Sequence, residues 1–391
     1  MSYKTVIRLL FVFHFFGDLI LIYAVDKLFL LSRNISIQEI AVLVAIWSGL
    51  TVLLEVPTGA LADRWSRKYT LALSGLFYSL CYVTWIFSFS FWLFALGFLF
   101  RTLGGTFESG TLQAYTYDFL KKHGKEDEFE KIWGRCITLR VIGTAIAVAA
   151  GGYLSEISYT LVLVFSSLSP LVVTFVAFLL PEVKSTNIET GRSYLSYFRG
   201  GLKKAFSSRM LLKIMLYSGI VFAILGLLEE YDQVLISQRL GFSNTFIGIW
   251  AAVAVCVSSA GAFFAHRLKN LGWRILTMIA VITGTSLVAI SFIQSPVILG
   301  FLLVICISLV LTGVTIEGMI QREIKSEERA TITSACGVIS EIGTVIFGLV
   351  FGFIANKFGI HIGYGVLGAV ILIYISVQFL TGLRKRSDST R

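Results

Sequence analysis

Charged residues are scarce in this chain. Asp, Glu, Lys and Arg together make up 14% of the residues, while 56% are hydrophobic. A soluble globular domain contains about 25% charged residues. The scarcity of charge therefore excludes the soluble multidomain protein that a length of 391 residues would otherwise suggest, and it predicts an integral membrane protein.

Paired cysteines are missing as well. The five cysteines all fall inside apolar runs, their number is odd, and no two of them have the spacing of a zinc-ligand pair. This pattern argues against a disulfide framework and against a zinc site, so we expect small core residues between helices. The five are Cys81, Cys136, Cys256, Cys306 and Cys336.

Signatures of catalysis are absent from the sequence. It contains no phosphate-binding loop of the G-x-x-x-x-G-K-[ST] type, no cluster of metal-ligand residues and no nucleophile with a recognisable partner. We therefore expect a protein that is not an enzyme and that needs no cofactor and no metal.

Long apolar runs fill the chain instead. A helix crosses the hydrocarbon core of a membrane in about 20 residues, and the runs lack the period-two alternation of barrel strands. They predict an all-α membrane protein with twelve transmembrane helices. The predicted spans are 6–30, 38–60, 70–88, 91–117, 133–154, 158–180, 211–236, 244–266, 275–293, 296–320, 331–355 and 361–383.

The basic residues are distributed unevenly between the two sides of these spans. If the N-terminus is cytoplasmic, 27 of the 33 Lys and Arg residues lie on the cytoplasmic side. This bias predicts a multi-pass protein of the cell membrane with both termini cytoplasmic. It also explains the net charge of +10 without a nucleic-acid partner. The residues expected on the outer side are Lys27, Arg33, Arg239 and Lys357.

The longest connection between spans is polar and basic. It divides the chain into an N-terminal six-helix bundle (1–183), a cytoplasmic central loop (184–210) and a C-terminal six-helix bundle (211–391). Within it, the stretch YLSYFRGGLKKAF suits either an amphipathic helix on the inner leaflet or a flexible linker.

The two halves resemble each other. CITLRVIGTAIAVAAGGYL, from Cys136, matches CGVISEIGTVIFGLVFGFI, from Cys336, at an offset of 200 residues. At an offset of 209, Glu108 aligns with Glu317. A duplicated six-helix bundle describes a transporter whose substrate site lies between the repeats, near the middle of the membrane.

The connection between the second and third spans carries a recognisable motif. GALADRWSRK, from Gly59 to Lys68, resembles motif A of the major facilitator superfamily, with Ser66 where the pattern has glycine. The twelve spans, the central loop and the internal repeat extend this resemblance over the whole chain. The resemblance implies the fold of that superfamily, in which two pseudo-symmetric six-helix bundles transport a small molecule by alternating access.

The resemblance also implies a gating role for the motif. Asp63 is expected to face the start of the eleventh span, and Arg67 is expected to pair with Asp118 at the inner end of the fourth span. Together they would latch one state of the transport cycle. The motif A residues are Gly59, Asp63, Arg64, Arg67 and Lys68, with Asp118 as partner.

Two further stretches resemble motifs of the superfamily. Arg101 followed by Gly105 resembles motif B, whose arginine is associated with proton coupling. The glycines of the fifth span keep the spacing of the antiporter motif C, although Ala147-Val148 replaces its Gly-Pro pair, and they predict close helix packing. These glycines are Gly134, Gly143, Gly151 and Gly152.

Ionisable groups inside the spans are candidate functional residues, because they are costly in a membrane unless paired or hydrated. We expect Asp18 and Arg101 to form the proton-coupling pair, with a static ion pair as the alternative. Arg140 and Glu341 are expected either to bridge the halves or to bind an anion. The remaining candidates are Glu108, together with Glu229, Glu230 and Asp232, which suit a solvated rim or gate as well as a site.

The cargo is expected to be lipophilic. Phe15, Tyr115, Tyr231 and Trp250 are candidates to line an apolar cavity, which with one or two carboxylates would suit lipophilic or cationic compounds. A sugar site would need Asn and Gln, which are scarce within the spans.

We therefore expect a monomeric secondary transporter of the plasma membrane, in contact with lipid, that exports small lipophilic compounds by proton antiport. The proton gradient would supply the energy. Transport of one specific metabolite, siderophore or amphipathic anion is the alternative. A receptor or lipid scramblase on the same scaffold would move no protons with its ligand.

Overall fold

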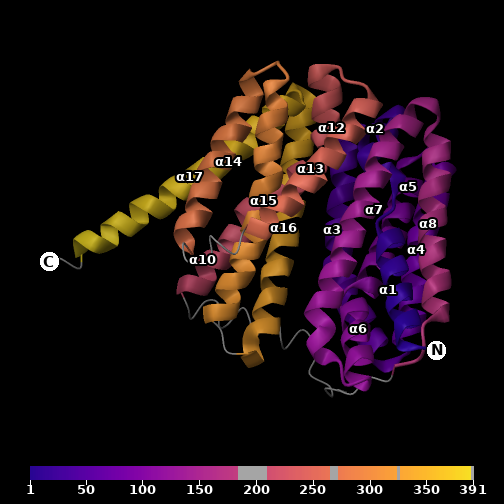
Figure 1. Cartoon of the computed structure of the whole chain (residues 1–391). Coiled ribbons are helices and arrows are strands. Elements are labelled where there is room, and N and C mark those ends of the chain that lie inside the picture. The colour runs from indigo at the N-terminus through magenta and orange to yellow at the C-terminus, as the bar shows by residue number, and fades with distance from the viewer. Residues whose placement is uncertain (184–208, 265–271, 324–325, 389–391) are drawn as a thin grey trace. The chain divides into compact units, whose positions relative to one another are not determined.

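A computed structural model describes residues 1–183, 209–264, 272–323 and 326–388. Within these ranges the secondary structure is helical, with no strand (Figure 1). The predicted central loop, with its amphipathic stretch, lies almost wholly outside the described residues, as do the side chains of Asp63 and Arg64.

The chain forms two compact units. Unit 1 comprises Met1–Ile35, Ile46–Tyr194 and Phe242–Cys256, and unit 2 comprises Ser36–Ala45, Leu195–Gly241 and Val257–Arg391. Each is described here by itself.

The first half of the chain contains these helices: α1 (Tyr3–Gly17), the 3-10 turn η1 (Leu21–Ala24), α2 (Asp26–Ser32), α3 (Ile37–Arg64), α4 (Arg67–Ile86), α5 (Phe91–Glu108), α6 (Thr111–Lys122), the 3-10 turn η2 (Glu126–Glu128), α7 (Phe129–Ile157) and α8 (Tyr159–Leu179).

The second half contains α10 (Arg209–Tyr217), the π-helical turn η3 (Ser218–Phe222), α11 (Ala223–Glu229), α12 (Asp232–Leu235), the π-helical turn η4 (Ile236–Leu240), α13 (Asn244–Phe264), α14 (Trp273–Phe292), α15 (Val297–Glu323), α16 (Ser326–Phe358) and α17 (Ile360–Asp388).

Eleven helices of the described chain are long and apolar enough to cross a membrane. The one predicted span without such a helix is the fourth, 91–117, which is broken into α5 and α6 at Ser109 and Gly110. Gly110 has a φ of +70°, which a residue with a side chain rarely adopts, so glycine permits the break. Together, α5 and α6 occupy the place of the fourth span.

The first and seventh predicted spans are also discontinuous. The helix of the first span ends at Gly17, turns through η1 and resumes as α2 at Asp26. The seventh breaks after Glu229 and resumes as α12 at Asp232. Broken membrane helices are tolerated where the freed backbone groups are buried in protein or line a hydrated space, so these breaks mark places of functional interest.

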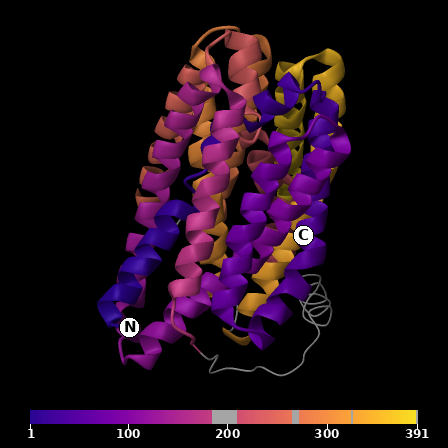
Figure 2. The ribbon, with the colours of Figure 1, turned by 90° about the vertical axis from the view of Figure 1, so that its right-hand side faces the viewer.

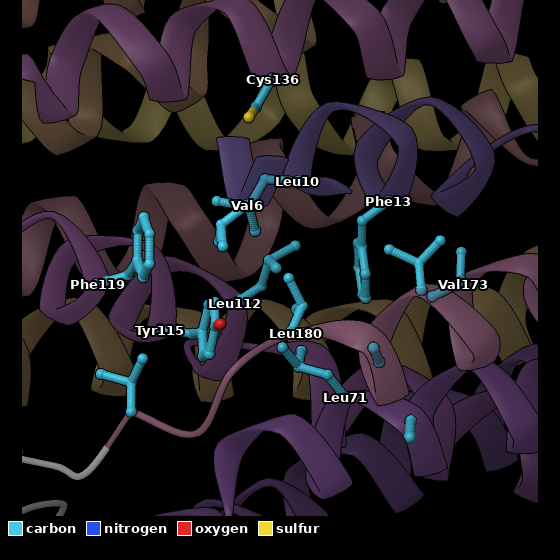
Figure 3. Close-up of a cluster of buried hydrophobic side chains, with 14 of the residues drawn as sticks. Val6, Leu10, Phe13, Leu71, Leu112, Tyr115, Phe119, Cys136, Val173 and Leu180 are labelled. Carbon is cyan, nitrogen blue, oxygen red and sulfur yellow. The ribbon is translucent and has the colours of Figure 1, made fainter. Parts of the chain in front are cut away.

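A cluster of buried apolar side chains holds the helices of unit 1 together (Figure 3). Val6, Leu10 and Phe13 of α1 contribute one side of it, and they are completely buried. Residues of α4, α6, α7 and α8 complete the cluster, including Leu71 and Val173. The packing fixes the position of α1, whose C-terminal end carries Asp18.

The N-terminus, the start of α4, the helix α6 and the end of α8 lie at one end of unit 1 (Figure 1). The turned view in Figure 2 shows the N-terminus at the same end. The Tyr3 hydroxyl donates to Glu128 at 2.8 Å, and the Lys68 ammonium donates to the backbone oxygen of Phe178 at 3.0 Å. The connections predicted to share the basic, cytoplasmic side therefore lie at one end of this unit.

Candidate functional site

Two carboxyl groups and one guanidinium form a charged network inside unit 1. Arg140 Nη2 donates to Glu108 Oε1, and Arg140 Nε lies 3.3 Å from Asp18 Oδ2. The Arg140 side chain is 28% exposed, that of Glu108 is 15% exposed and that of Asp18 is 35% exposed. We refer to Asp18, Glu108 and Arg140 as the shared-arginine network.

The backbone explains how these three groups meet. Asp18 is the C-cap residue of α1, and Glu108 is the last residue of α5, so each carboxyl stands where a helix stops. Arg140 comes from the middle of α7, which packs against α1. A Cβ at Gly17 would stand 3.5 Å from Arg140 Nη2, an ordinary van der Waals distance, so the backbone at Gly17 lies directly beside the guanidinium.

The network contains one carboxyl group more than its arginine can neutralise. Two carboxylates that share one cation inside a membrane repel each other, and protonating one of them relieves the repulsion. The arrangement is therefore suited to binding and releasing a proton.

The structure corrects the predicted Asp18–Arg101 pair. Asp18 lies beside Arg140, whereas Arg101 Nη1 lies 3.8 Å from Asp26 Oδ2. The guanidinium of Arg101 also stacks over the rings of Tyr23 and Trp47, at 5.1 Å and 4.6 Å. The predicted role of Arg140 with Glu341 joins residues of the two units and stays a prediction.

The Asp26 position is a candidate site that sequence reasoning missed. Lys27 is fully buried, and its ammonium lies 2.7 Å from Asp26 Oδ2. Asp26 is itself only 3% exposed. The count of basic residues assigned Lys27 to the outer side of the membrane and did not indicate that it packs inside unit 1, where the chain re-enters a helix at Asp26.

An internal repeat marks this position, although sequence reasoning had not used it. DKLFLLSR, from Asp26 to Arg33, matches DQVLISQR, from Asp232 to Arg239, at an offset of 206 residues. Both aspartates begin a helix directly after a break, at the first residue of α2 and of α12. The match would have added Asp26 to the list of candidates and separated Asp232 from its acidic neighbours.

The acidic candidates of unit 2 occupy different environments. Glu229 is exposed and Glu230 is half-buried, at the break after α11, and Glu341 is half-buried on α16. Asp232, in contrast, is only 4% exposed. Of the two readings left open by the sequence, a solvated rim therefore does not fit Asp232.

The aromatic candidates are also placed differently from one another. Tyr115 does not line a cavity, because it is fully buried in the core of unit 1 and its hydroxyl donates to the backbone oxygen of Pro181 at 2.9 Å (Figure 3). Tyr231 is buried against Phe351. Phe15 is half-buried on α1, and Trp250 is 9% exposed on α13.

The glycines of α7 lie at close backbone contacts. A side chain at Gly143 or Gly151 would collide with the backbone oxygens of Phe15 and Leu21, respectively, and one at Gly152 would stand 2.5 Å from the oxygen of Asn244. Gly134 differs, since a Cβ there would meet no described atom within 4 Å. Close packing thus requires three of the four predicted glycines.

The motif A segment forms the connection between α3 and α4. The expected Arg67–Asp118 pair is present and joins the start of α4 to α6. Ser66 stands where the motif has glycine, with a φ of −83° that any residue adopts. A Cβ at Gly59 would meet no described atom within 4 Å, and the expected contact of Asp63 with the eleventh span lies outside the described side chains.

Long apolar helices with broken segments and charged groups at the breaks are typical of helical membrane transporters. The sequence assigns the chain to a family within that class. Residues 8–343 match the family model of the Major Facilitator Superfamily. The chain belongs to this superfamily, and it is a membrane transporter with the twelve-helix fold of that family.

Similar proteins agree with this assignment. The uncharacterized MFS-type transporter YxaM of Bacillus subtilis (strain 168) is 23% identical over 383 residues, with 92% of each protein covered. Among solved structures, a mutant of the nucleoside transporter NupG superimposes with a TM-score of 0.83 at 12% identity, covering 97% of this chain and 99% of that one. A bacterial homolog of the human lysosomal transporter Spinster gives 0.78 at 14% identity, covering 98% and 97%. These structures share the fold.

Proposed function

We propose that this transporter is a proton-coupled exporter of small lipophilic or cationic compounds, working by alternating access in the plasma membrane with both termini in the cytoplasm. The observation that carries the proposal is the shared-arginine network, in which Asp18 and Glu108 compete for Arg140. Such a group of charges binds one proton more easily than two isolated ion pairs would.

The network also supports a coupling mechanism. When a proton binds one carboxyl, Arg140 pairs fully with the other carboxyl, and the energetic cost of burying the network falls. When the proton leaves, the second carboxylate again needs a cation. A cationic substrate can take that place, so that proton and substrate alternate at one site, as antiport requires.

The cargo preference rests on the charges of the membrane interior. Acidic groups stand at the three breaks of the spans, Asp18 and Glu108 in unit 1 and Glu229 and Asp232 in unit 2. Carboxylates beside aromatic side chains attract cations and tolerate lipophilic groups of varied shape, since neither contact needs close directional fit.

A growth experiment tests the transport claim. The chain is expressed in an efflux-deficient bacterium, and susceptibility to a panel of lipophilic cations and neutral lipophilic compounds is measured. We expect a several-fold rise in tolerance to some of them, and loss of that rise in Glu108→Gln. Glu126→Gln, an exposed glutamate in η2, is the matched control and should behave like the natural protein. No change in tolerance for any compound would contradict the proposed cargo.

Transport of an amphipathic anion is the second candidate. It is favoured by Lys27 and Arg101, two basic groups that stand beside Asp26 and bring an ammonium and a guanidinium into the interior of unit 1. Carboxylates and phosphates are the natural partners of such groups. This candidate would be favoured if the protein takes up a lipophilic carboxylate into vesicles and Arg101→Gln loses that uptake. The same protein should then not transport lipophilic cations.

A further inference from the structure

The repeat-related aspartates of the two units differ in their counter-charges. Asp26 of unit 1 contacts the ammonium of Lys27 and lies near the guanidinium of Arg101. At the offset of 206 residues, Gln233 takes the place of Lys27. Cys306 of α15 lies beside Asp232, with its sulfur 3.9 Å from Asp232 Oδ2. Asp26 therefore has two basic neighbours in unit 1, whereas the described hydrogen-bonding neighbours of Asp232 in unit 2 are neutral.

The surroundings of Asp232 contain no cation within the described part of the chain. Its contacts are the Tyr364 hydroxyl from α17 and the Cys306 thiol from α15, while Glu229 lies close enough to repel a negative charge. The element α16 contributes Phe351, which packs on Tyr231. A carboxylate that is 4% exposed in such surroundings would carry an uncompensated buried charge.

The hydrogen bonds of Tyr364 point to the same conclusion. Its hydroxyl oxygen lies 2.9 Å from the backbone oxygen of Leu228 and 3.0 Å from Asp232 Oδ1. A backbone oxygen only accepts, and a hydroxyl has one hydrogen to donate. Both contacts are full hydrogen bonds only if Tyr364 donates to Leu228 and accepts from a protonated carboxyl at Asp232.

We propose that Asp232 is a proton-binding site of unit 2, separate from the shared-arginine network, and that its carboxyl is protonated in the described conformation. The carboxyl O–H donates to Tyr364, which in turn donates to Leu228. Release breaks this O–H bond, passes the proton to water and leaves a carboxylate. The site extends the proposed proton coupling to the second repeat, and it rests on that proposal only for its role in transport.

Infrared difference spectroscopy of the purified protein in lipid vesicles tests the site directly. We expect the spectrum of the natural protein minus that of Asp232→Asn, at neutral pH, to show the carbonyl band of one protonated carboxylic acid, shifted in heavy water. In Tyr364→Phe the band should move to higher frequency, because the carboxyl loses its acceptor. Asp127→Asn, an exposed aspartate in η2, is the matched control and should leave the band unchanged.

A charge transplant provides the second variant. Gln233→Lys copies the Asp26–Lys27 pair of unit 1, and the fully buried Lys27 shows that the repeat accommodates a lysine there. The ammonium should deprotonate Asp232 and abolish the band while the protein stays folded and monodisperse. The proposal is overturned if both variants, Gln233→Lys and Asp232→Asn, keep the same carbonyl band as the natural protein, so that neither difference spectrum shows it.

The remaining outcomes also decide it. A band that is absent in sodium chloride and present in choline chloride would identify a metal cation as the occupant and overturn the proton site. If substrate drives proton movement but the band is absent, the proposed function stands and the Asp232 site is overturned. If the band is present but no lipophilic compound is exported, the Asp232 site stands and the proposed function is overturned.

Discussion

At the scale of single residues, Arg140 holds the position on which the candidate site depends. Among the ion pairs of the described residues, its guanidinium is the cation that Asp18 and Glu108 share. Removing one partner of such a network leaves uncompensated charge, which costs more than removing all partners together.

Replacing Arg140 with Gln should therefore destabilise the protein and stop transport. We expect a loss of roughly 2 kcal/mol, less than the ~3–5 kcal/mol of a fully buried pair, because solvent reaches part of the network. Thermal unfolding in detergent measures it. The triple variant Asp18→Asn, Glu108→Gln, Arg140→Gln should recover most of the stability and none of the transport. A triple variant less stable than the single one would contradict this account of the network.

Ser66 illustrates a residue whose departure from the family motif needs no unusual backbone conformation. Its φ of −83° is an ordinary one, so the backbone needs no glycine there. Ser66→Gly should lower the free energy of unfolding by about 0.4–1 kcal/mol, through the greater freedom of the unfolded chain, and should leave transport unchanged. A gain in stability would indicate a strained backbone at this position. Unfolding and efflux assays on the same variant measure both quantities.

At the scale of elements, the helix breaks position the charged groups. Asp18, Glu108 and Asp232 each stand beside a break, in the first, fourth and seventh spans. In a continuous helix the backbone N–H and C=O groups near these carboxyls would bond to one another, whereas a break frees some of those backbone groups beside the carboxyl. The candidate functional groups are thus concentrated where the regular structure stops.

The packing of α7 against the first span depends on small residues. Gly151→Val should collide with the backbone at Leu21 and cost about 1–3 kcal/mol, with loss of transport. Gly134→Val is the matched control on the same helix, because no described atom lies within 4 Å of its Cβ position. Yield of monodisperse protein and efflux are the readouts. Equal damage by both variants would show that the effect comes from the valine and not from the contact.

The sequence predicted the elements better than their breaks and pairings. Apolar length is a local property, so the spans could be located from composition alone. The break at Gly110 was not predicted, although the sequence turns polar at Glu108-Ser109-Gly110-Thr111, because the span was counted through to residue 117 and the positive φ of Gly110 is visible only in the structure. The Asp18–Arg101 pairing was wrong because partner choice depends on where α7 crosses α1, which is set by the contact of Gly143 with Phe15.

At the scale of the whole molecule, the distribution of basic residues predicts the orientation. The N-terminus and the connection before α7 lie at one end of unit 1, joined by the Tyr3–Glu128 hydrogen bond. The excess of Lys and Arg in these connections predicts that this end faces the cytoplasm.

Cysteine labelling in intact cells measures the orientation. In a variant without the five native cysteines, Ser90→Cys, in the exposed connection before α5, should react with a membrane-impermeant thiol reagent. Lys122→Cys, exposed at the end of α6, should react only after the cells are opened. Labelling of Lys122→Cys in intact cells would reverse the predicted orientation.

The central claim is that proton movement is coupled to substrate through the shared-arginine network. The most direct measurement is the internal pH of proteoliposomes, read with a trapped dye while a lipophilic cation is added outside. We predict a substrate-driven pH change with the natural protein and with Asp127→Asn, and its loss with Asp18→Asn and with Glu108→Gln. Substrate transport with no pH change, or an unchanged response in both network variants, would contradict the account.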